Sequence, residues 1–415
     1  MKRVVVTGIG AVSPLGNTFQ SAWTAAKAGI SGIGSITRFD ATHMRWKIAG
    51  ELKGFDPGRF LSPKEVRRLD PFVHYAVAAA MMAAEDAELF GKAESHQVKN
   101  SAVVLGSSRG GISTMEQAVI LSYETASARG KRKRSVSPYL MPATTTSMAS
   151  SYVAQKLGLQ GSCLGISNAC ASGTNAIGEA FRLVKHGLES LVFCGGAEAP
   201  LCSICIEGYG SAGALSERND STASRPFDRT RDGFVLSEGA CVLVLEEHSQ
   251  ACKRGVRIYG EIVGYGNTSD AFHQTIPSPE GEARAIRNAL TEAGLRPGDI
   301  GCINAHGTAT VIGDRVETRA LKVALGSSAY SIPVTSLKSM TGHMLASSGA
   351  FEAAMSIVSM NEGVILPTVN LEEKDAECDL DYVTELREKT IEYAVSNSFG
   401  FGGVNAILIF RGVRS

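Results

Sequence analysis

Short runs of β-branched and aliphatic residues alternate along the chain with longer, alanine-rich stretches. Runs of the first kind include Val4 to Thr7 and Ala102 to Leu105, and the longest stretch of the second kind extends from Pro71 to Ala87. Apolar runs of four or five residues bounded by turn residues are typical of buried strands, whereas longer apolar stretches favour helices. The pattern therefore predicts an α/β protein.

A second series of the same kind begins near Ile258. It contains a predicted helix over Glu282 to Ala293 and closes with a predicted strand near Asn397 to Phe410, after the Gly-rich turn SFGFGG. The chain has no long Pro/Ser/Gly linker and no low-complexity tract, so the two series are not expected to move independently. We predict two analogous halves, residues 1–256 and 257–415, which share one core.

Composition excludes several classes of function. With 415 residues, 44% of them hydrophobic and 20% charged, the chain can bury a large core. The 41 basic and 41 acidic residues balance, so no overall field attracts nucleic acid or an anionic membrane. The longest apolar stretch, Ala76 to Ala84, falls short of the roughly 18 to 20 residues of a membrane span. We expect a cytoplasmic protein that binds neither nucleic acid nor membrane.

Neither a metal site nor a nucleotide cofactor is expected. The nine cysteines are irregularly spaced, which favours reduced thiols, and Cys202 and Cys205 lack the second pair that a zinc site needs. Gly8 and Gly10 follow a predicted strand, as in dinucleotide-binding proteins, but Ser13 replaces the third glycine of that motif. We therefore predict no resident cofactor and no metal.

Cys170 stands immediately before a predicted helix over residues 171–186, and it is the strongest candidate nucleophile. Ile177, Phe181 and Val184 provide the apolar spacing of that helix. Free N–H groups and the positive end of a helix dipole favour a thiolate, which is the reactive form of cysteine. From this segment alone, a buried structural cysteine in a tight turn is an equally good interpretation.

Two histidines strengthen the functional interpretation. His306 follows a predicted strand that ends at Ile303, and His343 precedes an Ala/Ser-rich helix; each stands beside a glycine in a turn. Side chains at such boundaries reach clefts, although either histidine alone is more often structural. The candidate site therefore depends on whether the fold brings both rings to Cys170.

Four motifs together resemble the elongating β-ketoacyl-acyl carrier protein synthases. They are NACASG at 168–173, NAHGTAT at 304–310, KSMTGH at 338–343 and NSFGFGG at 397–403. Supporting segments extend the resemblance over essentially the whole chain. It implies a thiolase-like fold, in which two pseudo-symmetric halves form an α/β/α/β/α layered core.

The resemblance also implies a decarboxylative Claisen condensation for chain elongation in fatty acid synthesis. Cys170 would accept an acyl group from acyl carrier protein. His306 and His343, both neutral, would then stabilise the enolate formed when malonyl-acyl carrier protein loses CO2. The backbone N–H groups of Cys170 and Phe401 would form the oxyanion hole, and Lys338 would order the histidines.

The remaining roles follow from the same resemblance. Thr308 and Thr310 would hold the phosphopantetheine arm of the carrier protein, and Phe401 would act as a gate between flexible glycines. Phe399 and Gly402 are further substrate-binding candidates. Glu352 and Asp314 are expected to support the site, with Glu352 as the acidic neighbour of Lys338.

The expected partner is acyl carrier protein, which is acidic, so basic residues should surround the docking site. Lys64, Arg67 and Arg68 match the docking helix of the family, and Lys131 and Arg132 in the RGKRKR run are a second candidate. A solvated loop is the better interpretation of that run by itself. The chain is expected to form a homodimer, or a heterodimer with a chain-length-factor-like subunit if it serves a polyketide pathway.

Three alternatives stay open at this point. The chain could be the ketosynthase subunit of a type II polyketide or polyene pathway. A noncatalytic chain-length partner is less favoured, because such partners typically lose the nucleophile. A cysteine hydrolase is also conceivable, although no signature of such a family is present. The Thr/Ser/Met-rich stretch near residues 137–158 and the ASSGA sequence after His343 differ from the usual family pattern, which leaves acyl-chain preference open.

Overall fold

The computed structural model describes residues 1–89, 96–127 and 136–413. Its main element is a sheet of ten strands in the order β10-β9-β13-β14-β8-β1-β7-β6-β4-β5. The N-terminal half supplies β1 (Val4–Val12), β4 (Ala102–Gly106), β5 (Cys163–Ile166), β6 (Leu191–Glu198) and β7 (Gly239–Glu247). The C-terminal half supplies β8 (Gly260–Ser269), β9 (Cys302–Asn304), β10 (Val334–Thr335), β13 (Tyr393–Gly400) and β14 (Val404–Gly412).

Strand pairing repeats between the two halves. Outward from β1, the pairs β1–β7 and β7–β6 are antiparallel, and β6–β4 and β4–β5 are parallel. Outward from β8, the pairs β8–β14 and β14–β13 are antiparallel, and β13–β9 and β9–β10 are parallel. The halves join where Val4 to Val6 pairs with Gly260 to Ile262. This identical order confirms the two pseudo-symmetric halves of a thiolase-like fold, whereas the boundary at residue 256 stays a prediction.

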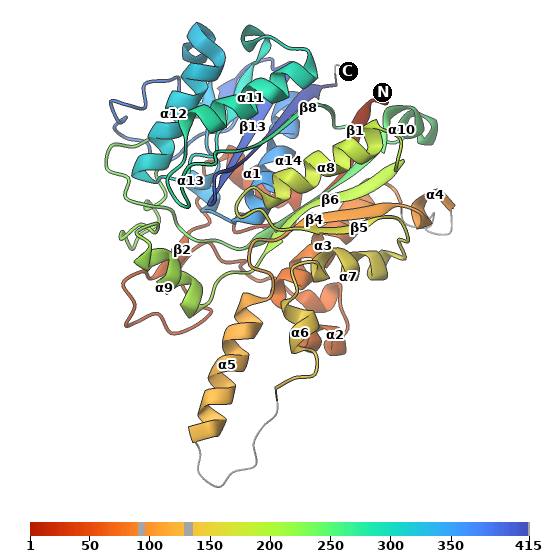
Figure 1. The fold of residues 1–415 in the computed structure, drawn as a ribbon, viewed down its shortest axis with the longest axis vertical. Coiled ribbons are helices and arrows are strands. Elements are labelled where there is room, and N and C mark those ends of the chain that lie inside the picture. Colours follow the sequence, from red (N-terminus) through yellow and green to blue (C-terminus); the bar gives the residue numbers. More distant parts are fainter. Residues whose placement is uncertain (90–95, 128–135, 414–415) are drawn as a thin grey trace.

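Helices lie in three layers around the strands. The middle layer is formed by α8 (Ser172–Lys185) and α14 (Ala346–Glu362), which Figure 1 shows between the other helices. One outer layer contains α3 (Pro71–Asp86) and α7 (Met148–Leu157), and the other contains α11 (Pro279–Ala293) and α12 (Val311–Leu325). The remaining helices are α1 (Phe19–Lys27), α2 (Pro63–Arg68), α4 (His96–Lys99), α5 (Ile112–Ser127), α6 (Leu140–Thr144), α9 (Ser203–Ser211), α10 (His248–Arg254) and α13 (Lys338–Thr341).

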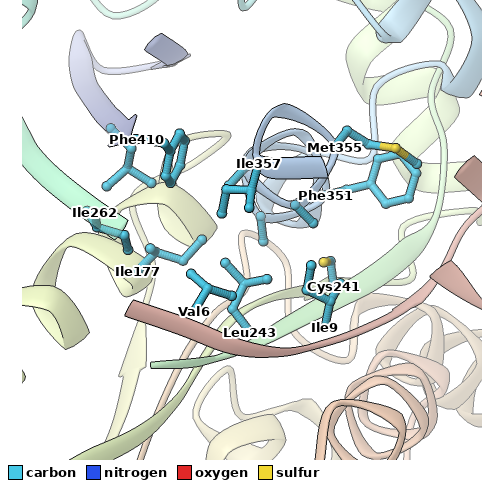
Figure 2. Close-up of a cluster of buried hydrophobic side chains, with 14 of the residues drawn as sticks. Val6, Ile9, Ile177, Cys241, Leu243, Ile262, Phe351, Met355, Ile357 and Phe410 are labelled. Atoms are coloured by element: carbon cyan, nitrogen blue, oxygen red, sulfur yellow. The ribbon is translucent and has the colours of Figure 1, made fainter. Parts of the chain in front are cut away.

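The central core lies around the two middle helices. Figure 2 shows Ile177 of α8 beside Val6 of β1, and Ile357 of α14 beside Phe410 of β14. The helices approach closely: a Cβ atom on Gly173 would lie 2.2 Å from the Ala346 carbonyl oxygen. Because Gly173 and Ala346 follow the two catalytic candidates Cys170 and His343 by three residues each, this contact brings the two halves of the site together.

Peripheral elements complete the fold. Two short two-stranded sheets pair β2 (Gly34–Ser35) with β3 (Ile48–Ala49) and β11 (Val364–Ile365) with β12 (Arg387–Glu388). Helix α5 projects away from the body of the molecule (Figure 1). Across the described ranges, no helix is both long and apolar enough to cross a membrane.

One predicted strand differs in its bounds. A Gly-rich turn was predicted before a strand near Asn397 to Phe410, but the turn at 401–403 lies inside that range, between the end of β13 and β14. Gly402 and Gly403 have φ of +86° and +70°, which lie in the left-handed region that glycine readily adopts. The glycines reverse the chain and so make an antiparallel hairpin out of one apolar run.

Candidate functional site

Cys170 occupies a strained turn between β5 and α8. The preceding residue, Ala169, has φ of +47°, which is uncommon for a residue with a side chain. Ser172 holds the turn: its hydroxyl accepts the Asn168 N–H at 2.8 Å and donates to the Ala169 carbonyl at 2.6 Å. Helix α8 begins at Ser172, close to the predicted start, so Cys170 stands just ahead of its first turn.

Burial opposes the thiolate that the helix start favours at this position. Burial raises the pKa of the Cys170 thiol to about 12, although the charges of Lys338 and Arg109 and a hydrogen bond from the Phe401 N–H act in the opposite direction. Glu198 raises it further. Desolvation of an anion therefore outweighs the helix start, and Cys170 rests as a protonated thiol.

His306 is held by a carboxylate that the sequence analysis did not identify. Glu317 of α12 accepts the backbone N–H groups of His306 and Gly307, both at 2.8 Å, and the side-chain amide of Asn397 at 2.9 Å. All of this occurs in the interior, since Glu317 is 2% exposed. The contacts tie the loop after β9 to both α12 and β13, which fixes the position of the His306 ring.

The two histidine rings pack against each other edge to face. Their centroids lie 5.3 Å apart with an interplanar angle of 84°, and Phe234 packs edge-on against His343 at 5.2 Å. Burial and the charge of Lys338 hold the pKa of both rings well below the ordinary value of 6.5, and His343 lowers that of His306 further. Both imidazoles are therefore neutral near pH 7, and each carries a single N–H donor.

Lys338 and Glu352 form a buried ion pair, and the charge of Lys338 acts on both rings. The Lys338 Nζ lies 2.5 Å from Glu352 Oε1, and both side chains are 1% exposed. Burial raises the pKa of Glu352, and the charge of Lys338 opposes that shift. The pairing of these two residues agrees with the expectation from the family, and the lysine affects the site through its field.

The Gly-rich turn closes the site from the other side. Phe399 packs against His306 at 5.8 Å, and the Phe401 ring lies 6.4 Å from Tyr209 with 38% of the residue exposed. The Gly402 N–H donates to the Gln274 carbonyl at 2.7 Å. Through that bond, the turn is joined to the segment after β8, which lines the same entrance.

A cavity of about 310 Å³ connects these groups. Cys170, His306, His343, Thr308 and Thr310 all line it, together with Phe399 and Phe401. The hydroxyls of Thr308 and Thr310 lie 3.0 Å apart at its wall. The fold therefore brings the sulfur, both rings and both threonines to one concave space, as the sequence analysis expected.

Asp314 supports the wall of this cavity from α12. Its carboxylate accepts the N–H groups of Phe227 at 2.7 Å and Ala309 at 3.1 Å, and it lies 3.3 Å from the Arg231 guanidinium. Burial raises its pKa to about 7 despite the arginine. Ala309 has φ of +67°, so Asp314 stabilises a strained backbone beside the threonines.

The predicted docking residues are less directly connected with the cavity. Lys64, Arg67 and Arg68 lie on α2, where Arg68 stacks on Tyr139 at 4.2 Å. Figure 1 shows α2 next to α6, well away from α12, whose first turn lines the cavity. Lys131 and Arg132 lie outside the described residues.

Three site residues escaped the sequence analysis. Glu317 holds the His306 loop, and Ser348 contacts His343. Glu198, whose pKa burial raises to about 7, accepts the N–H groups of Ser108 and Arg109 near Cys170. A glutamate within a buried stretch was a signal for Glu198, whereas Glu317 occupies an ordinary helical position.

No group of three or more His, Cys, Asp or Glu side chains suited to a metal occurs in the part of the chain described here.

Comparisons with known proteins agree with this geometry. Family models described as beta-ketoacyl synthase, N-terminal domain, and beta-ketoacyl synthase, C-terminal domain, match residues 1–251 and 259–372. The chain is 46% identical to 3-oxoacyl-[acyl-carrier-protein] synthase 2 of Synechocystis sp., covering 99% of this chain and 98% of that protein. It is 43% identical to the protein of the same name from Staphylococcus aureus, with the same coverage.

Solved structures share the fold over the full length. A beta-ketoacyl synthase from Burkholderia phymatum superimposes with a TM-score of 0.91 at 37% identity, and the two chains cover each other completely. The ishigamide ketosynthase/chain length factor gives 0.93 at 32% identity, again with complete coverage of both chains. Two family models together match most of the sequence, and relatives at 43–46% identity match nearly all of it. The chain belongs to the beta-ketoacyl synthase family.

Proposed function

We propose that the chain catalyses the decarboxylative condensation of an acyl group, held on Cys170, with malonyl-acyl carrier protein. The products are β-ketoacyl-acyl carrier protein and CO2, and the process is chain elongation in fatty acid synthesis. The single observation that carries the proposal is the meeting of one cysteine and two neutral imidazoles at a common cavity. The names of the relatives support the same reaction.

In the first half-reaction, the Cys170 sulfur attacks the thioester carbonyl of an acyl group on the carrier protein. The thiol proton ends on the departing pantetheine sulfur, so the carrier leaves as a free thiol. The N–H groups of Cys170 and Phe401 would stabilise the tetrahedral oxyanion, and the hydrogen bond from Phe401 to the resting sulfur supports this role. Thr308 and Thr310 would bind the pantetheine arm through their hydroxyls, and Phe399 and Gly402 would flank it.

In the second half-reaction, the malonyl group loses CO2 and its electron pair moves into an enolate. His306 and His343 would each donate one N–H to the enolate oxygen, which neutral rings in a desolvated site can do without losing a proton. The enolate carbon then attacks the acyl-Cys170 carbonyl, the cysteine sulfur leaves as a thiolate, and it takes up one proton from water to restore the resting thiol. Lys338 supports this step by keeping both rings neutral, and Glu352 balances its charge.

Mass spectrometry of the acyl-enzyme tests the assignment. The protein would be incubated with acyl-carrier proteins of several chain lengths and then with malonyl-carrier protein. Cys170→Ala should abolish acylation and carbon–carbon bond formation, while Cys252→Ala, at an exposed cysteine, should retain both. Release of free acid without condensation would indicate a hydrolase instead.

The acidic carrier protein is the proposed partner, and α2 is the proposed docking element. Reversing Arg67 and Arg68 to Glu should raise KM for acyl-carrier protein and leave small thioester substrates unaffected, because docking charge acts on the protein partner only. An equal loss on both substrates would argue against docking at α2.

A homodimer is the proposed assembly. Strand β5 forms one edge of the sheet, Leu164 on it is 45% exposed, and Val119 and Ile120 on α5 are 61% and 50% exposed. An exposed edge strand of this kind readily pairs with another chain. Leu164→Glu should shift the sedimentation coefficient from dimer to monomer, whereas Ile30→Glu, at a residue 55% exposed in the segment after α1, should not.

A second candidate function is the ketosynthase subunit of a type II polyketide pathway. A solved structure described as a type II PKS acyl-carrier protein in complex with its ketosynthase is 31% identical with a TM-score of 0.89. This supports the alternative less than the 46% identity to 3-oxoacyl-[acyl-carrier-protein] synthase 2 supports fatty acid elongation. Co-purification from the native host with a homologous chain that lacks the active-site cysteine would support this alternative. A stable homodimer that extends saturated acyl chains would support fatty acid synthesis.

A further inference from the structure

Ser348 contacts His343 directly, and no role in the condensation has yet been given to it. The serine lies in the first turn of α14, five residues after the histidine. Between them, Leu345 has φ of +46°, so the chain turns sharply and the serine hydroxyl faces back toward the histidine loop. Its Oγ lies 3.2 Å from His343 Nδ1 and 2.9 Å from the Met344 nitrogen. Ser348 is 1% exposed and His343 is 2% exposed.

These two contacts determine the direction of the hydrogen bonds. The Met344 N–H is a donor only, so the Ser348 oxygen accepts from it. The other hydrogen-bond partner of the Ser348 hydroxyl in the structure is His343 Nδ1. If Nδ1 carried the ring proton, the buried Ser348 hydroxyl proton would have no acceptor, which is costly in the interior. The arrangement is therefore satisfied when Ser348 donates to an unprotonated Nδ1.

The consequence concerns the other ring nitrogen. A neutral imidazole carries one proton, so an Nδ1 that accepts a hydrogen bond leaves the proton on Nε2. His343 lines the cavity with Cys170, and Nε2 is the nitrogen at the far end of the ring from the serine. We propose that Ser348 is a positioning residue that holds His343 in its Nε2–H tautomer, so that the ring presents a donor to the enolate oxygen. This inference rests on the proposed condensation.

His306 differs in this respect. Its Nδ1 is buried and has no hydrogen-bond partner, so no side chain selects its tautomer in the same way. The backbone of His306 is held by Glu317, but that contact leaves the ring nitrogens unaffected. Within the pair, the serine contact is therefore specific to His343.

The neighbouring serine supplies a matched control. Ser347 is equally buried, and its hydroxyl donates to the Met344 carbonyl at 2.9 Å without touching either histidine. Ser348→Ala should lower the rate of malonyl-carrier protein decarboxylation about 2- to 12-fold, the effect of one neutral hydrogen bond. Acyl loading onto Cys170 should be unchanged, because His343 acts only in the second half-reaction. Ser347→Ala should leave both rates near those of the wild type, and Ser348→Thr should restore decarboxylation.

Nitrogen NMR of protein labelled with [15N]histidine reads the tautomer independently of activity. The His343 signals, assigned by their loss in His343→Gln, should show an Nε2–H ring in wild type and a mixture of tautomers in Ser348→Ala. An unchanged spectrum, or an equal loss of decarboxylation in Ser347→Ala, would overturn the role of Ser348. If wild-type protein does not decarboxylate malonyl-carrier protein at all, the proposed condensation fails, while the spectrum still decides the tautomer.

Discussion

The contribution of the buried Lys338–Glu352 ion pair to the free energy of unfolding can be measured by replacing each residue. Both side chains are 1% exposed, and the second carboxylate oxygen of Glu352 has no hydrogen-bond partner. Removing either partner leaves a buried ionisable group alone, which typically costs about 3–5 kcal/mol of stability. Three variants separate the contributions: Lys338→Met, Glu352→Leu and the double replacement.

The two single variants should differ in magnitude. In Lys338→Met, the Glu352 carboxyl escapes its penalty by taking up a proton, since burial already raises its pKa. Against an ordinary pKa of 4.5, keeping a carboxyl protonated at pH 7 costs about 3 kcal/mol. In Glu352→Leu, the Lys338 ammonium is left buried without its carboxylate partner, and an unpaired buried charge costs about 3–5 kcal/mol. The carboxyl can lower its penalty by taking up a proton, so Glu352→Leu should be the less stable of the two variants.

The pH dependence separates the two variants. Burial raises the pKa of Glu352, so folded Lys338→Met keeps a carboxyl proton that the unfolded chain loses above the ordinary pKa of 4.5, and its stability relative to wild type rises as pH falls toward 4.5. The slope is at most about 1.4 kcal/mol per pH unit. Glu352→Leu has no buried carboxyl to take up that proton, so it should not share this gain on acidification. The double variant buries neither group and should follow the wild-type slope.

Urea unfolding between pH 5 and 9 measures these slopes. Lys27→Met removes a partly exposed ion pair with Glu362 and serves as the control, because such pairs contribute less than about 1 kcal/mol. An equal gain in stability on acidification in both single variants would refute the reasoning. So would a double variant as unstable as Glu352→Leu.

Three further predictions concern the cavity. Burial and Lys338 hold the pKa of His306 and His343 well below 6.5, so the rate of malonyl decarboxylation should not decline between pH 8 and 6. In Lys338→Met, the fall in rate on acidification should begin at higher pH. A fall in the wild-type rate near pH 6.5 would contradict this prediction. Glu317→Gln should reduce the free energy of unfolding by about 1–3 kcal/mol, since one amide oxygen cannot replace two carboxylate acceptors. Calorimetry measures this difference, with Glu280→Gln at an exposed glutamate as the control. Phe401→Ala keeps the backbone N–H that faces the sulfur, so stopped-flow acylation should be altered severalfold in rate and not abolished; complete loss would mean that the ring itself is required.

Local patterns were sufficient to predict much of this protein. The apolar runs predicted β1 and β4, and helical spacing after Cys170 predicted α8 almost to its ends. Such features depend on neighbours within a few residues, which a sequence displays directly. The NACASG, NAHGTAT and KSMTGH motifs identified the family and the three residues that meet at the cavity.

Tertiary structure decided the rest, because burial and long-range contacts have no local signal. The state of Cys170 reversed: a helix start favours a thiolate, but desolvation in the folded site raises the thiol pKa to about 12. Glu317 and Ser348 act on histidines through contacts that only the packing of α12 and α14 creates. The apolar run 397–410 became two strands because its partners, β9 and β8, lie on opposite sides of the hairpin. Residue types and motifs thus determined the chemistry available to the chain, and the fold determined the charge and orientation in which each group is held.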